Sequence, residues 1–181
     1  MDTSPTARQW FADASAGFIE LVSQVTASDL DQPGLGVWTV RDLIGHTSRS
    51  FLTIEEYLRA APRSERLTGP GEYFRTALGA QTDPDAVAER GRQAARALGA
   101  EPTASVIALA ERVRALVDAS PDSASATTPW GTMSLADYLP TRAFELTAHS
   151  LDLASATDRG VPNGIATSLG AALAVCVDIA D

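Results

Sequence analysis

The sequence predicts an all-α protein, a four-helix bundle with extra short helices that forms a single domain over residues 1–181. Along most of the chain, apolar residues recur at spacings of three and four, which is the period of an amphipathic helix. We find no strand-like alternation of apolar and polar residues, and no internal repeat. With 181 residues, of which 45% are hydrophobic, the chain is long enough to bury a substantial core.

The first two helices are predicted from apolar spacing and from a capping pattern between them. Residues 6–27 form an amphipathic helix with the stripe Trp10, Phe11, Ala14, Phe18, Leu21, Val22 and Val25. A loop follows at 28–37, because this segment contains Pro33, Gly34 and Gly36. Thr39 is then an N-cap, with Asp42 as the carboxylate of a capping box, and this helix runs to about Ala60.

His46 lies on the flank of this second helix, outside its apolar stripe of Val40, Ile44, Thr47, Phe51, Ile54 and Leu58. At about 100° per residue, the histidine falls about 120° from the centre of the stripe. The same flank carries Thr39, Leu43, Ser50, Thr53 and Tyr57. Two interpretations stay open: a half-exposed surface histidine, or part of the wall of a polar cleft.

The middle of the chain is predicted to contain a charged helix and an apolar one. A loop at 61–71 and a short segment at 72–79 come first. A charged surface helix then covers 83–98, with an Asp cap, Pro at its first position and Gly99 as its stop. The next helix, 102–120, buries the face formed by Val106, Ile107, Leu109, Ala110, Val113, Leu116 and Val117. A linker of low complexity at 120–128 and a turn at 129–132 follow.

The helix after this turn carries polar groups where burial is expected. It begins at the N-cap Ser134 and ends near Thr157, and Pro140 predicts a kink or a late start. One side is apolar through Leu135, Leu139, Leu146 and Leu153, and the opposite side through Phe144 and Leu151. Because a helix that is apolar on two sides is buried on both, the polar stripe between them should face a cavity or another helix. This stripe consists of Tyr138, Arg142, Glu145, His149 and Asp152.

Three residues of the chain are candidates for a metal site. Glu145 and His149 are four residues apart, so both can reach one ion, although such a pair also occurs as a simple helix-stabilising contact. His46, the only other histidine, supplies a third ligand if the two helices face each other. A set of two histidines and one glutamate leaves a coordination position open, as in catalytic zinc sites. Zinc is the expected metal, and nickel, iron and manganese are also compatible.

Arg142 and Asp152 are candidates for groups around this site. Arg142 could orient Glu145 or receive a substrate carboxylate, and Asp152 could contact His149. Surface ion pairs between Arg142 and Glu145, or between His149 and Asp152, are equally compatible with the spacing.

The final helix is predicted from about Asn163. Its apolar run, 164–180, contains Asp178 and is shorter than the about 20 residues that span a bilayer, so we expect no membrane segment. No stop signal precedes Asp181, and we expect the C-terminal end of the domain to be truncated in this sequence. The single cysteine, Cys176, is predicted to be a small buried residue and not a nucleophile.

The charge and the composition of the chain limit the binding partners and the cellular compartment that are expected for it. Lys and Arg number 14 against 23 Asp and Glu, a net charge of −9, which disfavours nucleic acid and anionic membranes. The N-terminal segment has no basic or apolar region of a secretory signal, so a cytoplasmic protein is expected. Homodimerisation through exposed apolar helix faces is compatible with such a bundle.

Two blocks of the sequence resemble a known family. WTVRDLIGH at 38–46 and PWGTMSLADYL with RAFELTAHSLDLA at 129–154 are similar to the mycothiol-dependent maleylpyruvate isomerase N-terminal domain, the actinobacterial branch of the DinB/YfiT-like four-helix bundles. The resemblance implies that His46, Glu145 and His149 bind a divalent metal, usually zinc. It also implies mycothiol or a similar thiol as cosubstrate.

The resemblance further implies an enzymatic activity. A divalent-metal-dependent enzyme of this kind would activate a low-molecular-weight thiol for transfer to a small electrophilic substrate, or for its isomerisation. Two alternatives stay open: a hydrolase that uses metal-bound hydroxide, and a non-catalytic metal-binding helical module whose acidic surface binds a protein partner.

Overall fold

The structure, a computed structural model, describes residues 6–80 and 83–180. Within these residues it contains seven helices and one two-stranded hairpin, which confirms the all-α prediction apart from the hairpin. The helices are α1 (Ala7–Gln24), α2 (Val40–Arg59), α3 (Pro70–Gly79), α4 (Pro84–Ala97), α5 (Pro102–Ala119), α6 (Leu135–Ala156) and α7 (Asn163–Ala180), and the strands are β1 (Ser125–Thr128) and β2 (Gly131–Ser134).

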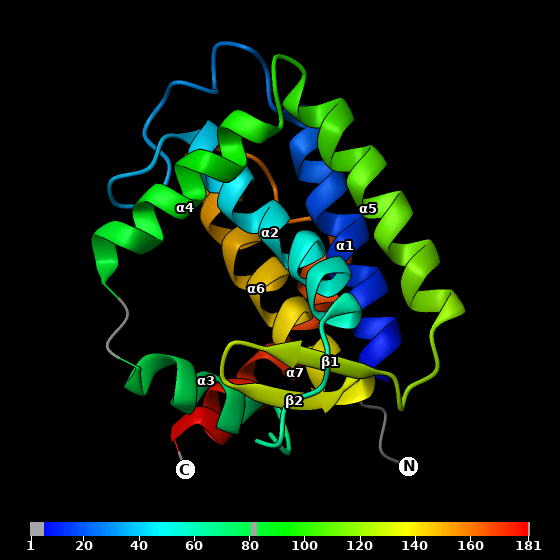
Figure 1. The fold of residues 1–181 in the computed structure, drawn as a ribbon. Coiled ribbons are helices and arrows are strands. Elements are labelled where there is room, and N and C mark those ends of the chain that lie inside the picture. Colours follow the sequence, from blue (N-terminus) through cyan, green and yellow to red (C-terminus); the bar gives the residue numbers. More distant parts are fainter. Residues whose placement is uncertain (1–5, 81–82, 181) are drawn as a thin grey trace.

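Four of these helices form a closed bundle, in which α1 and α2 each pack against both α5 and α6 (Figure 1). Aromatic rings hold α1 and α2 together at its centre. The ring centroid of Phe51 lies 6.0 Å from that of Phe11 and 6.3 Å from that of Phe18, and all three side chains are buried. The other helices lie outside: α4 covers α2, and α7 packs on α1, α6 and α3. The bundle with extra helices is therefore confirmed.

The start of α2 shows the predicted capping box. The Thr39 side chain accepts a hydrogen bond from the backbone N–H of Asp42, and the Asp42 carboxylate accepts one from the backbone N–H of Thr39. One turn later, α2 and α4 approach each other at Gly45, where a Cβ atom would lie 2.3 Å from the backbone nitrogen of Ala95. This close approach seats α4 directly beside the turn that carries His46.

The α6 helix runs through Pro140 without interruption, so the expected late start is wrong. Proline removes one N–H donor from a helix interior, but here the N-cap Ser134 fixes the first turn by accepting from the N–H of Asp137. The four leucines predicted to line one side are all fully buried, namely Leu135, Leu139, Leu146 and Leu153.

The segment before α6 is an antiparallel hairpin, which corrects the prediction of a linker and a turn. Ser125 pairs with Ser134, and Thr128 with Gly131. The strands have four residues each, which is too few for a recognisable alternation of apolar and polar residues. The hairpin is held by hydrogen bonds to a segment distant in the sequence. Thr132 of β2 accepts a hydrogen bond from the N–H of Leu67 and donates one to the carbonyl of Glu65.

The α7 helix packs on the rest of the molecule along one side, where Ile165, Ser168 and Val175 are buried and Asp178 accepts a hydrogen bond from the N–H of Gly71. Cys176 is consequently exposed, and its predicted burial is wrong. With a mean hydropathy of 1.5 over 18 residues, α7 is also long and apolar enough to cross a membrane by length and composition, although only 17% of it is buried against the rest of the chain. The absence of a membrane segment stays a prediction.

An ion pair between α2 and α5 predicts how the stability of the fold depends on pH. Arg112 donates two hydrogen bonds to the Glu55 carboxylate, at 2.7 and 3.1 Å, and these bonds lower the pKa of Glu55 below 4.5. Because the arginine side chain is 56% exposed, we expect Glu55→Gln to lower the free energy of unfolding by only about 0.5–1 kcal/mol at neutral pH.

The sign of the effect follows from the lowered pKa. A carboxyl group with a depressed folded-state pKa stabilises the fold above its unfolded pKa, and this contribution is lost as the pH falls through the folded pKa. The difference between wild type and Glu55→Gln in urea unfolding should therefore shrink as the pH is lowered below 4.5. Glu111→Gln, a substitution of an exposed glutamate on α5, is the control and should change little. A difference that is constant with pH would contradict the assignment.

Candidate metal centre

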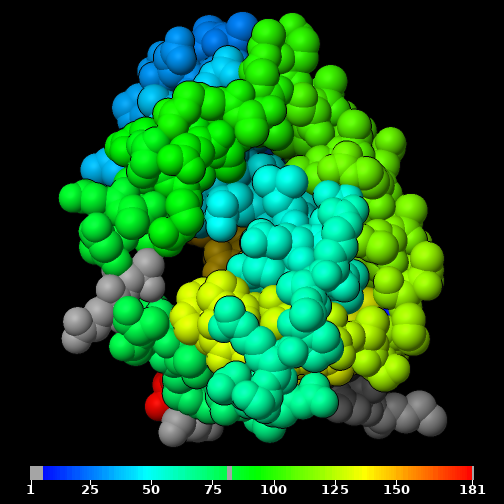
Figure 2. Space-filling model, in the orientation of Figure 1, coloured from blue at the N-terminus to red at the C-terminus, as the bar shows by residue number. Residues whose placement is uncertain are grey.

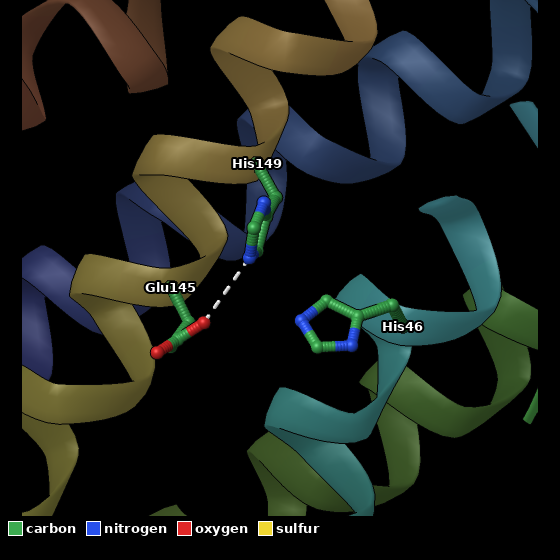
Figure 3. A group of neighbouring side chains, drawn as sticks. All are labelled: His46, Glu145 and His149. Atoms are coloured by element: carbon green, nitrogen blue, oxygen red, sulfur yellow. Dashed lines mark ion pairs between the residues drawn. The ribbon is translucent and has the colours of Figure 1, made fainter. Parts of the chain in front are cut away.

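The structure brings together the three candidate ligands from the two sequence blocks. His46 projects from α2, and Glu145 and His149 project from successive turns of α6 toward it (Figure 3). One ligand atom from each residue lies within 4.8 Å of the other two. The Oε2 atom of Glu145 lies 3.2 Å from Nε2 of His149, and the two imidazole rings have centroids 4.8 Å apart.

The chemistry and spacing of these donors fit a divalent cation. Two imidazoles and one carboxylate are typical zinc ligands, which bind at about 2.0–2.2 Å and so lie about 3–4 Å from one another. Figure 3 shows a ring nitrogen of His46 directed at the space beside Glu145 and His149. The nitrogen directed there is Nε2, whereas Nδ1 faces away from the other two residues, is buried and has no hydrogen-bond partner among the described residues.

The surroundings shift the pKa values of the three candidate ligands in different directions. Burial, and next the charge of His149, lower the pKa of His46 to about 4, so this ring is neutral at pH 7. Burial alone would lower the pKa of His149 too, but its hydrogen bonds to Asp152 and Glu145 raise it to about 9. For Glu145, burial opposes ionisation, yet the hydrogen bond from His149 and the charge of Arg142 lower its pKa to about 2. Without a cation, His149 is thus a charged bridge between two carboxylates.

Asp152 orients the His149 ring. Its Oδ2 atom lies 3.0 Å from Nδ1 of His149, and an ionised carboxylate only accepts, so the ring donates this bond. Nε2 is then the atom turned toward Glu145 and the centre of the cluster. A carboxylate behind a histidine in this way is a common feature of metal sites. The contact between Asp152 and His149 is present in the structure, and a role of Asp152 in a metal site stays a prediction.

Arg142 does not pair with Glu145. It is buried, and its guanidinium donates to the Thr141 hydroxyl at 2.9 Å and to the Tyr73 hydroxyl at 3.1 Å. No carboxylate within the described residues lies within 4.0 Å of it. A surface ion pair is therefore excluded for Arg142.

Two of the three candidate ligands, His46 and Glu145, line a cavity of about 750 Å³. Figure 2 shows the surface hollowed between α4 and the turn of α2 beside it, with atoms of α6 behind. Besides His46 and Glu145, the lining includes aromatic and cationic side chains from α2, α3, α4, α6 and the hairpin turn, notably Arg49, Tyr57, Tyr73, Phe74, Arg90, Trp130 and Arg142.

Sequence reasoning missed Trp38 as part of the site. Its ring stacks on His46 with centroids 4.3 Å apart, and its Nε1–H donates to the Ala88 carbonyl of α4 at 3.0 Å. Trp38 belongs to the same sequence block as His46, but it precedes the helix cap, so helical spacing says nothing about its position. Tyr73 was missed because the segment around it was predicted only as a short element.

Comparison with known protein families gives a match over most of the chain. The family model for the mycothiol maleylpyruvate isomerase N-terminal domain matches residues 11–154, a range that includes α2, α6 and all three candidate ligands. No curated protein and no solved structure matches the chain.

Proposed function

The chain belongs to the mycothiol maleylpyruvate isomerase N-terminal domain family, and from this we propose that it is a divalent-metal-dependent enzyme that transfers a low-molecular-weight thiol to a small electrophile. The observation that carries the proposal is the convergence of His46, Glu145 and His149, of which His46 and Glu145 line a cavity of about 750 Å³. When bound there, a divalent cation such as zinc supplies a Lewis acid that lowers the pKa of a thiol, so that the thiolate exists at neutral pH.

The residues of the chain hold this ligand set in place. His46 is kept neutral by burial and is covered by the Trp38 ring, so its position and its protonation state both suit a ligand. Asp152 fixes the orientation of His149 through Nδ1. The three ligands come from two helices of the bundle, which are rigid supports for a site that leaves a coordination position open.

The cavity supplies room for the two reactants. Its aromatic lining by Tyr73, Phe74 and Trp130 offers apolar contact to the electrophile. In a transfer to a conjugated double bond, the sulfur forms a bond to the electrophilic carbon, and the proton released by the thiol is taken up at the neighbouring carbon. Rotation about the new single bond followed by elimination of the thiol gives isomerisation, with no net reagent consumed.

The test is thiol transfer by zinc-loaded protein, with mycothiol as the thiol and monobromobimane as a generic electrophile. Wild type should accelerate conjugation above the uncatalysed rate, and Glu145→Gln should lose at least about tenfold of this acceleration. Glu20→Gln on the exposed side of α1 removes the same charge away from the cavity and should behave as wild type.

Two results would overturn the proposal in different directions. Zinc-dependent hydrolysis of p-nitrophenyl acetate without thiol transfer would favour a hydrolase that uses the same three residues. Zinc-loaded protein with neither activity would favour a non-catalytic metal-binding module.

A further inference from the structure

The hydroxyl group of Tyr73 belongs to a cavity-lining residue and has its own proton unused. Tyr73 lies on α3 and is only 5% exposed, although it contributes to the lining of the cavity. Its oxygen accepts a hydrogen bond from Nη2 of Arg142 at 3.1 Å, and it donates to no described residue. Because a buried hydroxyl donor normally has an acceptor, a reactant in the cavity would complete the hydrogen bonding of this group.

The phenol ring of Tyr73 is held in place on several sides. Its centroid lies 5.2 Å from those of Phe74 and Trp130 and 6.0 Å from that of Tyr138, each in an edge-to-face arrangement. The Arg142 guanidinium contacts the face of the same ring, with its central carbon 5.2 Å from the centroid. These contacts fix the position of the hydroxyl oxygen relative to the cavity.

The charges around this hydroxyl suit a group that loses and regains a proton. Burial raises the pKa of Tyr73 above its usual value, while the charge of Arg142 lowers it and that of Glu145 raises it, so the phenol is protonated at neutral pH. After the proton has left, the guanidinium that already donates to this oxygen stabilises the phenolate by a charge-assisted hydrogen bond. Tyr73 and Arg142 therefore form a pair that can give up a proton and hold the resulting negative charge.

The other two tyrosines of the chain lack this combination. Tyr138 is fully buried and outside the cavity lining, and its hydroxyl donates to the Thr53 hydroxyl at 2.9 Å. Tyr57 lines the cavity, but its hydroxyl has no hydrogen bond to a described residue and so no cation on its oxygen. Tyr73 combines a place in the lining, an unused proton and a guanidinium on the oxygen.

We propose that Tyr73 is a catalytic residue, the acid that protonates carbon when a thiol adds to a conjugated double bond. The inference rests on the proposed function, since it needs a thiolate and an electrophile in the cavity. The sulfur forms a bond to one carbon, the electron pair of the double bond moves to the neighbouring carbon, and that carbon takes the proton of the Tyr73 hydroxyl. The phenolate, paired with Arg142, then takes up the proton that the thiol released, which restores the starting state.

The test compares two reactions of the zinc-loaded full chain with mycothiol, of which only one protonates carbon. Addition to cyclohexenone, a neutral enone, needs a proton at the carbon beside the carbonyl, whereas substitution on monobromobimane releases bromide and needs none. Tyr73→Phe should slow the catalysed addition by about a hundredfold or more. It should leave the substitution within about threefold of wild type. Tyr138→Phe removes the same atom from the other ring on the guanidinium and should leave the ratio of the two rates as in wild type.

Heavy water as the solvent gives a second readout, which does not depend on the folding of a variant. A proton delivered by one fixed hydroxyl places deuterium on one face of the carbon beside the carbonyl, and deuterium NMR distinguishes the two faces. Wild type should label one face, and Tyr73→Phe both. If Tyr73→Phe does not fold by circular dichroism, wild type alone decides, because deuterium on both faces would overturn the inference.

The inference and the proposed function fail in different reactions. If wild type transfers mycothiol to monobromobimane, and Tyr73→Phe adds mycothiol to cyclohexenone as fast as wild type, the proposed function stands and the inference is overturned. Equal slowing of both reactions in Tyr73→Phe would mean that the phenol only shapes the cavity, which also overturns the inference alone. If wild type catalyses neither reaction, the proposed function fails and the inference fails with it.

Discussion

Protein purified without a histidine tag is expected to carry about one divalent cation per chain, and His46→Ala and His149→Ala are each expected to carry less than about a tenth of that. The reason is the size of the ligand set, because loss of one of three donors leaves two groups that cannot enclose an ion. The two histidines lie in different sequence blocks and on different helices, yet their rings lie 4.8 Å apart between centroids. Equal loss of metal from both variants would show that the two sequence blocks supply ligands to one site.

The measurement is inductively coupled plasma mass spectrometry on wild type and on each variant after dialysis against zinc. Glu145→Gln should join the depleted variants, while Glu20→Gln should retain the wild-type content, since Glu20 is exposed on α1. Circular dichroism on each sample shows whether the helices are intact. If wild type takes up no zinc on titration, the three residues form only a hydrogen-bonded cluster between two helices.

Gly45→Ala is expected to lower the free energy of unfolding by about 1–3 kcal/mol, although alanine is the better helix former. The added Cβ would lie 2.3 Å from the backbone nitrogen of Ala95 and 2.5 Å from its Cα. Backbone atoms cannot rotate aside, so α4 must move away from α2. This movement would also pull Ala88 from Trp38 and loosen the ring that covers His46.

The matched control is Gly170→Ala on α7, where a Cβ would meet nothing within 4 Å. There the same substitution should leave the stability unchanged or raise it by about 0.5–1 kcal/mol, because only helix propensity changes. Urea unfolding followed by circular dichroism measures both variants. Equal effects of the two substitutions would show that the contact between α2 and α4 is not tight.

The helices could be predicted because each carries its own signal. The capping box of Thr39 and Asp42, and the apolar spacing of 134–157, are local patterns, and both are found in the structure. The hairpin had no such signal, since its pairing depends on contacts with 65–67 far along the chain. For Cys176, composition indicated burial, but burial is decided by what packs on α7, and on that side nothing among the described residues does.

The candidate ligands could be predicted in part. The spacing of Glu145 and His149 on one helix places them together, whereas the approach of His46 depends on how two helices pack. The cavity could not be predicted, because its lining combines helices, a loop and a hairpin turn. The burial of Arg142 between two tyrosines is likewise a tertiary property.

The placement of α3 and α4 has a consequence for how the cavity can vary. The three candidate ligands lie on α2 and α6, inside the bundle, whereas Tyr73, Phe74, Val87 and Arg90 of the cavity wall come from one contiguous stretch, 70–97. Mutation within this stretch can change the shape of the cavity while the helices that carry the three candidate ligands stay unchanged. Part of the cavity wall therefore lies on a segment of the chain separate from the candidate ligands, so substitutions there alter the cavity without altering α2 or α6.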